Sequence, residues 1–106
     1  MAEGLNKVFL QGNIGSDPEL RTAGSTSVLE FRLATNERYK DRDDKWVEKT
    51  EWHNINVWGA RAEALDKILK KGSSLLVEGS LQTDSWEDRE SGQKKYKTLI
   101  RAHNIV

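Results

Sequence analysis

Apolar and polar residues alternate in several short segments of the chain, and a two-residue period predicts strands. Between about residues 28 and 37, Leu29, Phe31 and Leu33 alternate with charged residues, so one face of this strand is expected to be buried. The same reasoning predicts four further strands, at 5–12, 52–58, 75–83 and 95–106.

One helix is predicted between the third and fourth strands, over residues 59–72, with a glycine at each end. Its apolar residues share one helical face: Ala62, Leu65, Ile68 and Leu69. Gly72 is expected to end the helix in the left-handed conformation, which would place Lys70 and Lys71 at the negative end of the helix dipole.

Three polar segments connect these elements. Residues 12–18 concentrate turn formers and include the only proline, so they are expected to form a loop. Residues 38–49 are dense in charge and are expected to form a hairpin tip that extends past the sheet. Residues 84–94 are predicted to form a second hairpin loop with its turn at Ser91 and Gly92.

Five strands with a helix between the third and fourth predict an all-β fold, the five-stranded OB-fold, which is a Greek-key barrel. An open α+β sheet is the alternative. The chain has 106 residues, which suffices for one hydrophobic core, so a single domain over residues 1–106 is expected.

Composition excludes several classes of protein. The absence of cysteine excludes a disulfide scaffold, a thiolate metal site and a thiol nucleophile. No apolar run approaches the roughly 20 residues that span a bilayer, and the first residues lack the layout of a signal peptide. We therefore expect a cytoplasmic protein with no membrane partner.

The formal net charge is zero, with 17 basic and 17 acidic residues. Proteins that bind nucleic acids usually carry a basic excess. A polyanion could therefore bind only if cations gather on one surface and if another interaction contributes part of the affinity. The aromatic residues are the candidates for that interaction.

Residues 52–58 carry two tryptophans on a polar face. Alternation in a strand puts four residues on that face: Trp52, Asn54, Asn56 and Trp58. The other face carries His53, Ile55 and Val57 and is expected to join the core. Two rings about 20 Å apart and turned toward water suit a ligand with stacked rings. They would equally suit a second core or a contact between subunits.

Further aromatic residues lie on the two predicted hairpins, namely Tyr39, Trp46 and Trp86, each with basic neighbours in sequence. Single-stranded nucleic acids need this combination, because bases stack on rings for about 1–3 kcal/mol each while Lys and Arg follow the phosphates. A duplex hides its base faces. A barrel that binds proteins and a cold-shock-like barrel that binds RNA remain alternatives.

Residues for catalysis or metal binding are scarce. His53 and His103 lie on separate strands and match no ligand motif, so His53 is expected to be buried or at a subunit contact. The acidic run Asp41, Asp43 and Asp44 is interrupted by basic residues and lacks the glycine of a calcium loop. We predict no enzyme, no metal and no cofactor.

The sequence resembles the bacterial single-stranded DNA-binding protein family. The resemblance rests mainly on Gly12-Asn-Ile-Gly-Ser-Asp-Pro18, Thr50-Glu-Trp-His53 and Val77-Glu-Gly-Ser-Leu81, and it covers essentially the whole chain in order. It implies an OB-fold subunit of a homotetramer that binds single-stranded DNA without sequence preference and without catalysis. The implied roles are replication, recombination and repair at the nucleoid.

The resemblance also implies roles for individual residues. The base-stacking aromatics fall on Tyr39, Trp52, Trp58 and Trp86. Phosphate contacts fall on Lys7, Arg21, Arg42 and Lys71, with Arg61 one place away from the usual cation. His53 matches a histidine near subunit contacts. Trp46 matches no family role.

Some positions depart from the family pattern. Asn54, Gln82 and Asp84 stand where relatives are often basic, so we expect a shallow salt dependence of DNA binding. The chain stops directly after the last predicted strand, whereas family members continue into a flexible tail with an acidic, Phe-terminated tip. Replication and repair proteins are expected partners only where such a tail exists.

Overall fold

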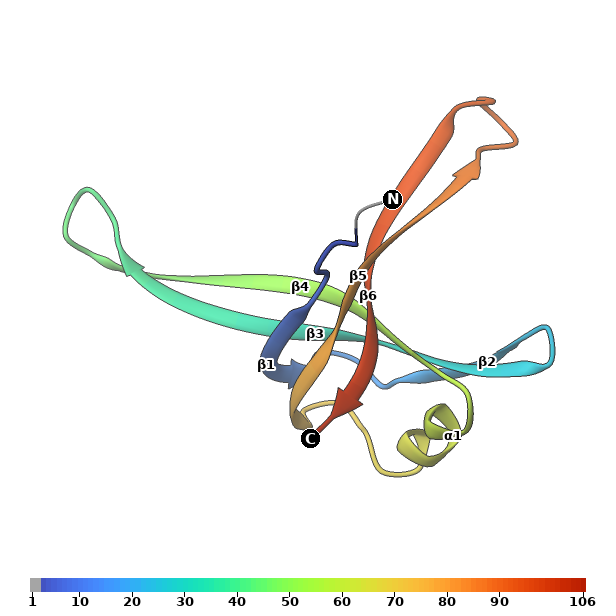
Figure 1. Cartoon of the computed structure of the whole chain (residues 1–106). Helices are drawn as coiled ribbons and strands as arrows, with labels where there is room; N and C mark the ends of the chain where they lie inside the picture. The colour runs from blue at the N-terminus through green and yellow to red at the C-terminus, as the bar shows by residue number, and fades with distance from the viewer. Residues whose placement is uncertain (1–2) are drawn as a thin grey trace.

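Six strands and one short helix make up the computed structural model, which describes residues 3–106 (Figure 1). The elements are β1 (Val8–Ile14), β2 (Glu19–Ala23), β3 (Thr26–Lys40), β4 (Trp46–Trp58), α1 (Ala60–Asp66), β5 (Ser74–Glu87) and β6 (Lys94–Ile105). The strands form one sheet in the order β1-β5-β6-β4-β3-β2.

The sheet closes on itself because β1 pairs with both β5 and β3. The ring is completed by a parallel pairing of β4 with β6 that contains two residue pairs, Ile55 with Ile100 and Asn56 with Arg101. The predicted five-stranded barrel with its helix between the third and fourth barrel strands, β4 and β5, is therefore confirmed. In addition, β2 pairs with β3 outside the ring.

The core lies inside this ring. Its fully buried side chains come from four barrel strands and include Ile14, Leu29, Leu33, Ile55 and Val77. The predicted alternation in β3 holds, because Leu29, Phe31 and Leu33 are all buried. Ala62 of α1 packs against the same core.

The first strand begins and ends later than predicted, so the expected loop at 12–18 starts only at Gly15. Gly12 and Asn13 pair with Leu75 and Ser74 of β5, and Asn13 also pairs with Ala34 of β3. Pairing on both sides outweighs the turn preference of these residues, a preference that is set by local interactions alone.

Strand β2 was not predicted from the sequence. All five of its residues are exposed, so it has no apolar alternation. It forms because the chain turns back through Gly24, whose φ is +66°, and pairs with the start of β3.

Two long hairpins extend from the barrel in different directions, as Figure 1 shows. One is formed by β3 and β4, with residues 41–45 at its tip, and the other by β5 and β6, with residues 88–93 at its tip. The first confirms the expected extension of residues 38–49 past the barrel. In the second, Gly92 has φ +69° and its N–H donates to the Asp88 carbonyl at 2.8 Å, which agrees with the predicted turn.

The helix is shorter than predicted, because α1 ends at Asp66. Ile68 is 70% exposed rather than on the buried face, and Lys70 and Lys71 lie beyond the last helical turn. The helix ends early because the segment that follows it is held against β1, where the Gly72 N–H donates to the Ile14 carbonyl at 2.8 Å. Gly72 does adopt the expected left-handed φ, +92°. Within residues 3–106, no helix has the length and apolar character needed to cross a membrane.

Barrel closure between β1 and β3 depends on Gly12. A Cβ at this position would lie 2.1 Å from the Ala34 carbonyl oxygen, which belongs to rigid backbone. We expect Gly12→Ala to lower the free energy of unfolding by about 1–3 kcal/mol or more, measured by urea denaturation at fixed protein concentration.

Gly4→Ala is the matched control, because a Cβ at Gly4 meets nothing within 4 Å. Its free energy of unfolding should stay within about 0.5 kcal/mol of the wild type. Equal stability of the two variants would show that the β1–β3 contact does not hold the barrel closed.

Candidate nucleic-acid interface

The register of β3 with β4 determines which side chains of β4 face outward. It runs without a bulge from the pair Val28–Trp58 to the pair Lys40–Trp46. Ile55 and Val57 are buried in the core, as predicted. Trp52 is 47% exposed on the other face, and Trp58 is half-buried there.

Asn54 and Asn56, which lie between these two tryptophans along β4, line a cleft of about 290 Å³. It is lined mainly by polar side chains, among them Asp17, Glu30, Arg32, Asn54, Asn56 and Lys97. This volume is close to the lower end of the range of roughly 300–1,000 Å³ for small-molecule sites. The cleft can therefore admit a group about the size of one nucleobase.

Asn56 differs from the expectation that its amide faces water, because the residue is only 5% exposed. Among residues 3–106 its Oδ1 has no hydrogen-bond partner, and the same holds for Nε1 of Trp58. An unpaired buried polar atom costs about 1–3 kcal/mol, so both atoms would gain from a ligand or a water. Asn56 therefore lines the bottom of the cleft rather than facing open solvent.

A cation lies over each exposed ring of this face. The Arg32 guanidinium is 4.5 Å from the centre of the Trp52 ring, and the Arg101 guanidinium is 5.5 Å from that of Trp58. These distances are within the range of cation–π attraction. Each ring therefore has a positive charge against its π-face.

Gly15 explains the position of the Trp52 ring. A Cβ at Gly15 would lie 2.0 Å from Cζ3 of Trp52, so the ring packs directly on the glycine backbone. This contact joins the segment between β1 and β2 to the face of β4. The sequence shows Gly15 only as a turn former, and the contact becomes visible only in the fold.

The other two predicted stacking residues lie on the hairpins. Tyr39 pairs with Val47 on the opposite face of the β3/β4 hairpin from Trp52, and it is half-exposed. Trp86 pairs with Lys95 on the β5/β6 hairpin and is 47% exposed. The structure therefore brings Trp52 and Trp58 together on one face and leaves Tyr39 and Trp86 apart from it.

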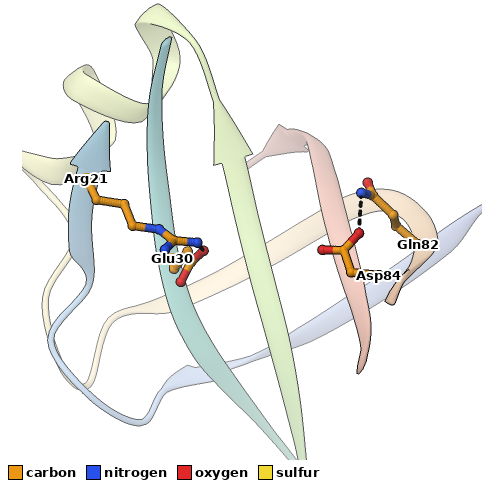
Figure 2. A network of polar contacts seen from close by, with 4 residues as sticks. All are labelled: Arg21, Glu30, Gln82 and Asp84. Carbon is orange, nitrogen blue, oxygen red and sulfur yellow. Dashed lines mark hydrogen bonds and ion pairs between the residues drawn. The ribbon is translucent and has the colours of Figure 1, made fainter. Parts of the chain in front are cut away.

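Two of the five predicted phosphate-binding cations form ion pairs with carboxylates. Lys7 Nζ lies 2.7 Å from Glu78 Oε1, and this hydrogen bond lowers the pKa of Glu78 below its usual value. Arg21 on β2 donates to Glu30 on β3, as Figure 2 shows. A phosphate would have to compete with each carboxylate.

The remaining three predicted cations have different surroundings. The guanidinium of Arg61 donates to the backbone carbonyl of His103 and forms no ion pair with a carboxylate of residues 3–106. The backbone N–H of Lys71 donates to Asp17 at 3.1 Å, while its side chain is exposed. Arg42 is exposed at the hairpin tip and forms no ion pair with any residue in 3–106.

Gln82 and Asp84, two of the positions expected above to depart from the family pattern, lie on β5. Gln82 Nε2 donates to Asp84 Oδ1 at 3.0 Å, so these side chains bind each other (Figure 2). On the same hairpin, backbone N–H groups and Lys95 lower the pKa of Asp88, which stays ionised at neutral pH. Asp88 is paired with Lys95 at 3.0 Å, and Lys95 also lies opposite Trp86 in the β5–β6 register, so a cation stands next to this ring.

The two histidine side chains form hydrogen bonds with hydroxyl groups of the same chain. His53 Nε2 lies 2.9 Å from the Thr35 hydroxyl, and His103 Nε2 lies 3.1 Å from the Ser80 hydroxyl. Residues 3–106 contain no group of three or more side chains placed to hold a metal ion. The role of His53 at a subunit contact stays a prediction.

Sequence reasoning missed Arg32 and Arg101 as members of this interface. Arg32 precedes a core leucine in β3, and Arg101 lies far away in sequence, on β6. Alternation alone places Arg32 on the outer face of β3, which was the available signal. No local signal points to Arg101, because its neighbour Asn56 is brought to it by the parallel β4–β6 pairing.

Comparison with known proteins adds close relatives. Residues 5–106 match the model of the "Single-strand binding protein family". Single-stranded DNA-binding protein 1 of Chlorobaculum tepidum is 52% identical over 101 residues, which cover 94% of this chain and 62% of the relative. The single-stranded DNA-binding protein of Rickettsia felis is 44% identical over 108 residues, covering 99% of this chain and 70% of the relative.

Solved structures with the same fold include one described as Plasmodium falciparum SSB in complex with ssDNA. It has a TM-score of 0.89 and 34% identity, and the alignment covers all of this chain and 97% of that one. The single-stranded DNA-binding protein from Thermus aquaticus aligns over all of this chain and 51% of its own, with a TM-score of 0.83 and 34% identity. With the match over residues 5–106, these findings show that the chain belongs to the single-strand binding protein family.

Proposed function

We propose that this protein binds single-stranded DNA without sequence preference and protects it during replication, recombination and repair. It is not an enzyme, because the family to which it belongs is a non-catalytic DNA-binding family. Its binding unit is the single OB-fold of residues 1–106, and it works at the nucleoid in the cytoplasm. The chain spans 62% of the length of the Chlorobaculum relative. Replication and repair proteins are proposed as partners only where a C-terminal tail is present.

The observation that carries the proposal is the outer face of β4. Trp52 and Trp58 lie on this face, and each has an arginine over its ring. Asn54 and Asn56, which lie between them along β4, line a cleft of about 290 Å³. Bases stack on such rings regardless of their sequence, since every base has a π-face. Tyr39 and Trp86 supply further stacking positions on the two hairpins.

The predicted phosphate contacts fall on five cations, Lys7, Arg21, Arg42, Arg61 and Lys71, of which the last three form no ion pair with a carboxylate of residues 3–106. Lys7 and Arg21 are already neutralised by Glu78 and Glu30. Stacking therefore contributes a larger share of the binding free energy than it would on a strongly basic surface. On this proposal, stacking supplies the part of the affinity that a chain with no net charge does not obtain from its cations.

Subunits assemble as a homotetramer through surfaces that include apolar residues outside the barrel. Phe9 on β1 is 60% exposed and Leu76 on β5 is 39% exposed, and the β1–β5 register places them on one face. Exposed apolar patches of this kind are typical of protein contacts. His53 is placed near such a contact by the family resemblance.

Trp52→Ala should weaken binding of (dT)16 roughly 5- to 150-fold, because one stacked base contributes about 1–3 kcal/mol. Quenching of tryptophan fluorescence on titration with the oligonucleotide measures the dissociation constant. Trp52→Phe keeps an aromatic ring and should retain most of the affinity. If Trp52→Ala split the assembly and left DNA affinity intact, the face of β4 would be a protein contact instead.

Glu30→Gln should release Arg21 for a phosphate and thereby raise the affinity for (dT)16. On a plot of log affinity against log salt, three free cations give a slope of about −2, and each additional phosphate contact adds about −0.7. Titrations at several salt concentrations measure both slopes.

Glu63→Gln is the control for this change, because Glu63 accepts a hydrogen bond from Ser27 and pairs with no cation among residues 3–106. It removes the same charge without freeing an arginine, so its slope should equal that of the wild type. A wild-type slope near −3.5 would mean that all five cations reach phosphates and that the ion pairs do not hold them back.

Phe9→Asp should dissociate the tetramer, because a carboxylate in an apolar contact loses its hydration without gaining a partner. Native mass spectrometry of the wild type should give four times the chain mass of 12.1 kDa, and the variant a smaller assembly. A wild-type chain that is monomeric at micromolar concentration would refute the proposed tetramer.

A further inference from the structure

Trp46 lies at the start of β4, at the tip of the β3/β4 hairpin, and is 62% exposed. Trp46 is neither one of the five predicted phosphate contacts nor one of the four predicted stacking positions. A large ring left this open at the end of a hairpin that projects from the barrel contributes little to the packing of the fold (Figure 1).

The register places Trp46 in one row with the tryptophans of the interface. Trp46, Trp52 and Trp58 are separated by six residues each, and the β3–β4 pairing has no bulge between them. An even spacing keeps all three side chains on the same face of the strand. Neighbouring rings are therefore about 20 Å apart, and the row is about 40 Å long before the twist of the strand is considered.

Each ring of this row has a cation near its face. Arg38 and Lys40 lie 5.5 and 5.3 Å from the centre of the Trp46 ring, as Arg32 does for Trp52 and Arg101 for Trp58. Arg38 and Lys40 are on the same face of β3 that Trp46 occupies on β4, because Lys40 pairs directly with Trp46. The tip therefore repeats the combination of ring and cation found at the barrel.

We propose that Trp46 is a third base-stacking position of the β4 face, so that a single strand leaves the barrel along β4 and reaches the hairpin tip. The inference rests on the proposed function and specifies the path of the DNA. Tyr39 lies on the other face of the hairpin and does not belong to this row. Flexible single-stranded DNA can follow the twist of β4, whereas a duplex cannot.

The alternative is that Trp46 only clamps the hairpin through Arg38 and Lys40. A clamp would act on every oligonucleotide equally, because it would change the hairpin itself. A stacking position at the end of the row acts only on oligonucleotides that are long enough to reach it. The length of the DNA therefore distinguishes the two roles.

The test is a fluorescence-anisotropy titration of labelled (dT)4 to (dT)16 with the wild type, Trp46→Leu and Trp46→Phe. This range brackets the roughly 4–16 nucleotides that OB-folds occupy. We expect Trp46→Leu to match the wild type on the shortest oligonucleotides and to lose roughly fivefold or more in affinity on the longest. Trp46→Phe should restore most of the loss.

Tyr96→Leu is the matched control. Tyr96 is 65% exposed and has Lys94 5.9 Å from its ring, but it lies on β6 outside the row. It should keep the length dependence of the wild type. An equal loss in both variants would assign the effect to exposed aromatic residues in general and overturn the proposed row.

Two further outcomes would also overturn the inference while leaving the proposed function in place. One is wild-type affinity of Trp46→Leu at every length, with Trp52→Ala still weakened. The other is an equal loss at every length together with a lower melting temperature, which is the result expected of a clamp. Failure of the wild type to bind any oligonucleotide would instead refute the proposed function itself.

Discussion

The antiparallel pairing of β3 with β4 is the constraint on which the fold and the interface both depend. Its register turns Leu33 and Ile55 inward and the tryptophans of β4 outward in the same step. A slip of one residue would exchange the two faces, exposing the core and burying the rings. Burial of the apolar face therefore also fixes the outward position of the proposed stacking residues.

The distribution of charge follows from the same arrangement. Carboxylates lie beside several cations of the surface, as for Lys49, whose pKa is raised by its hydrogen bond to Glu51. Such pairs limit long-range attraction of a polyanion but leave the rings accessible. Under the proposed function, such a surface would favour ligands that combine flat apolar faces with negative charge over ligands that offer charge alone.

Much of the fold could be predicted from the sequence, because alternation in β3 and β4 reports burial directly. The features that local sequence patterns did not predict depend on pairing between segments that are distant in sequence. Exposed β2 forms only because β3 is there to pair with it, and α1 stops early because Gly72 binds β1. In the interface, the tryptophans were predictable from alternation, whereas Arg101 and the Gly15 contact depend on the closed barrel.

The short parallel seam between β4 and β6 has a consequence for folding. The β3–β4 and β5–β6 hairpins join neighbouring segments, so each closes a small loop and can form early. The seam has only two residue pairs and unites strands separated by the helix and β5. We therefore expect two hairpins to form first and the barrel to close last. Amide hydrogens that donate across this seam would then report the opening of the ring without the loss of either hairpin.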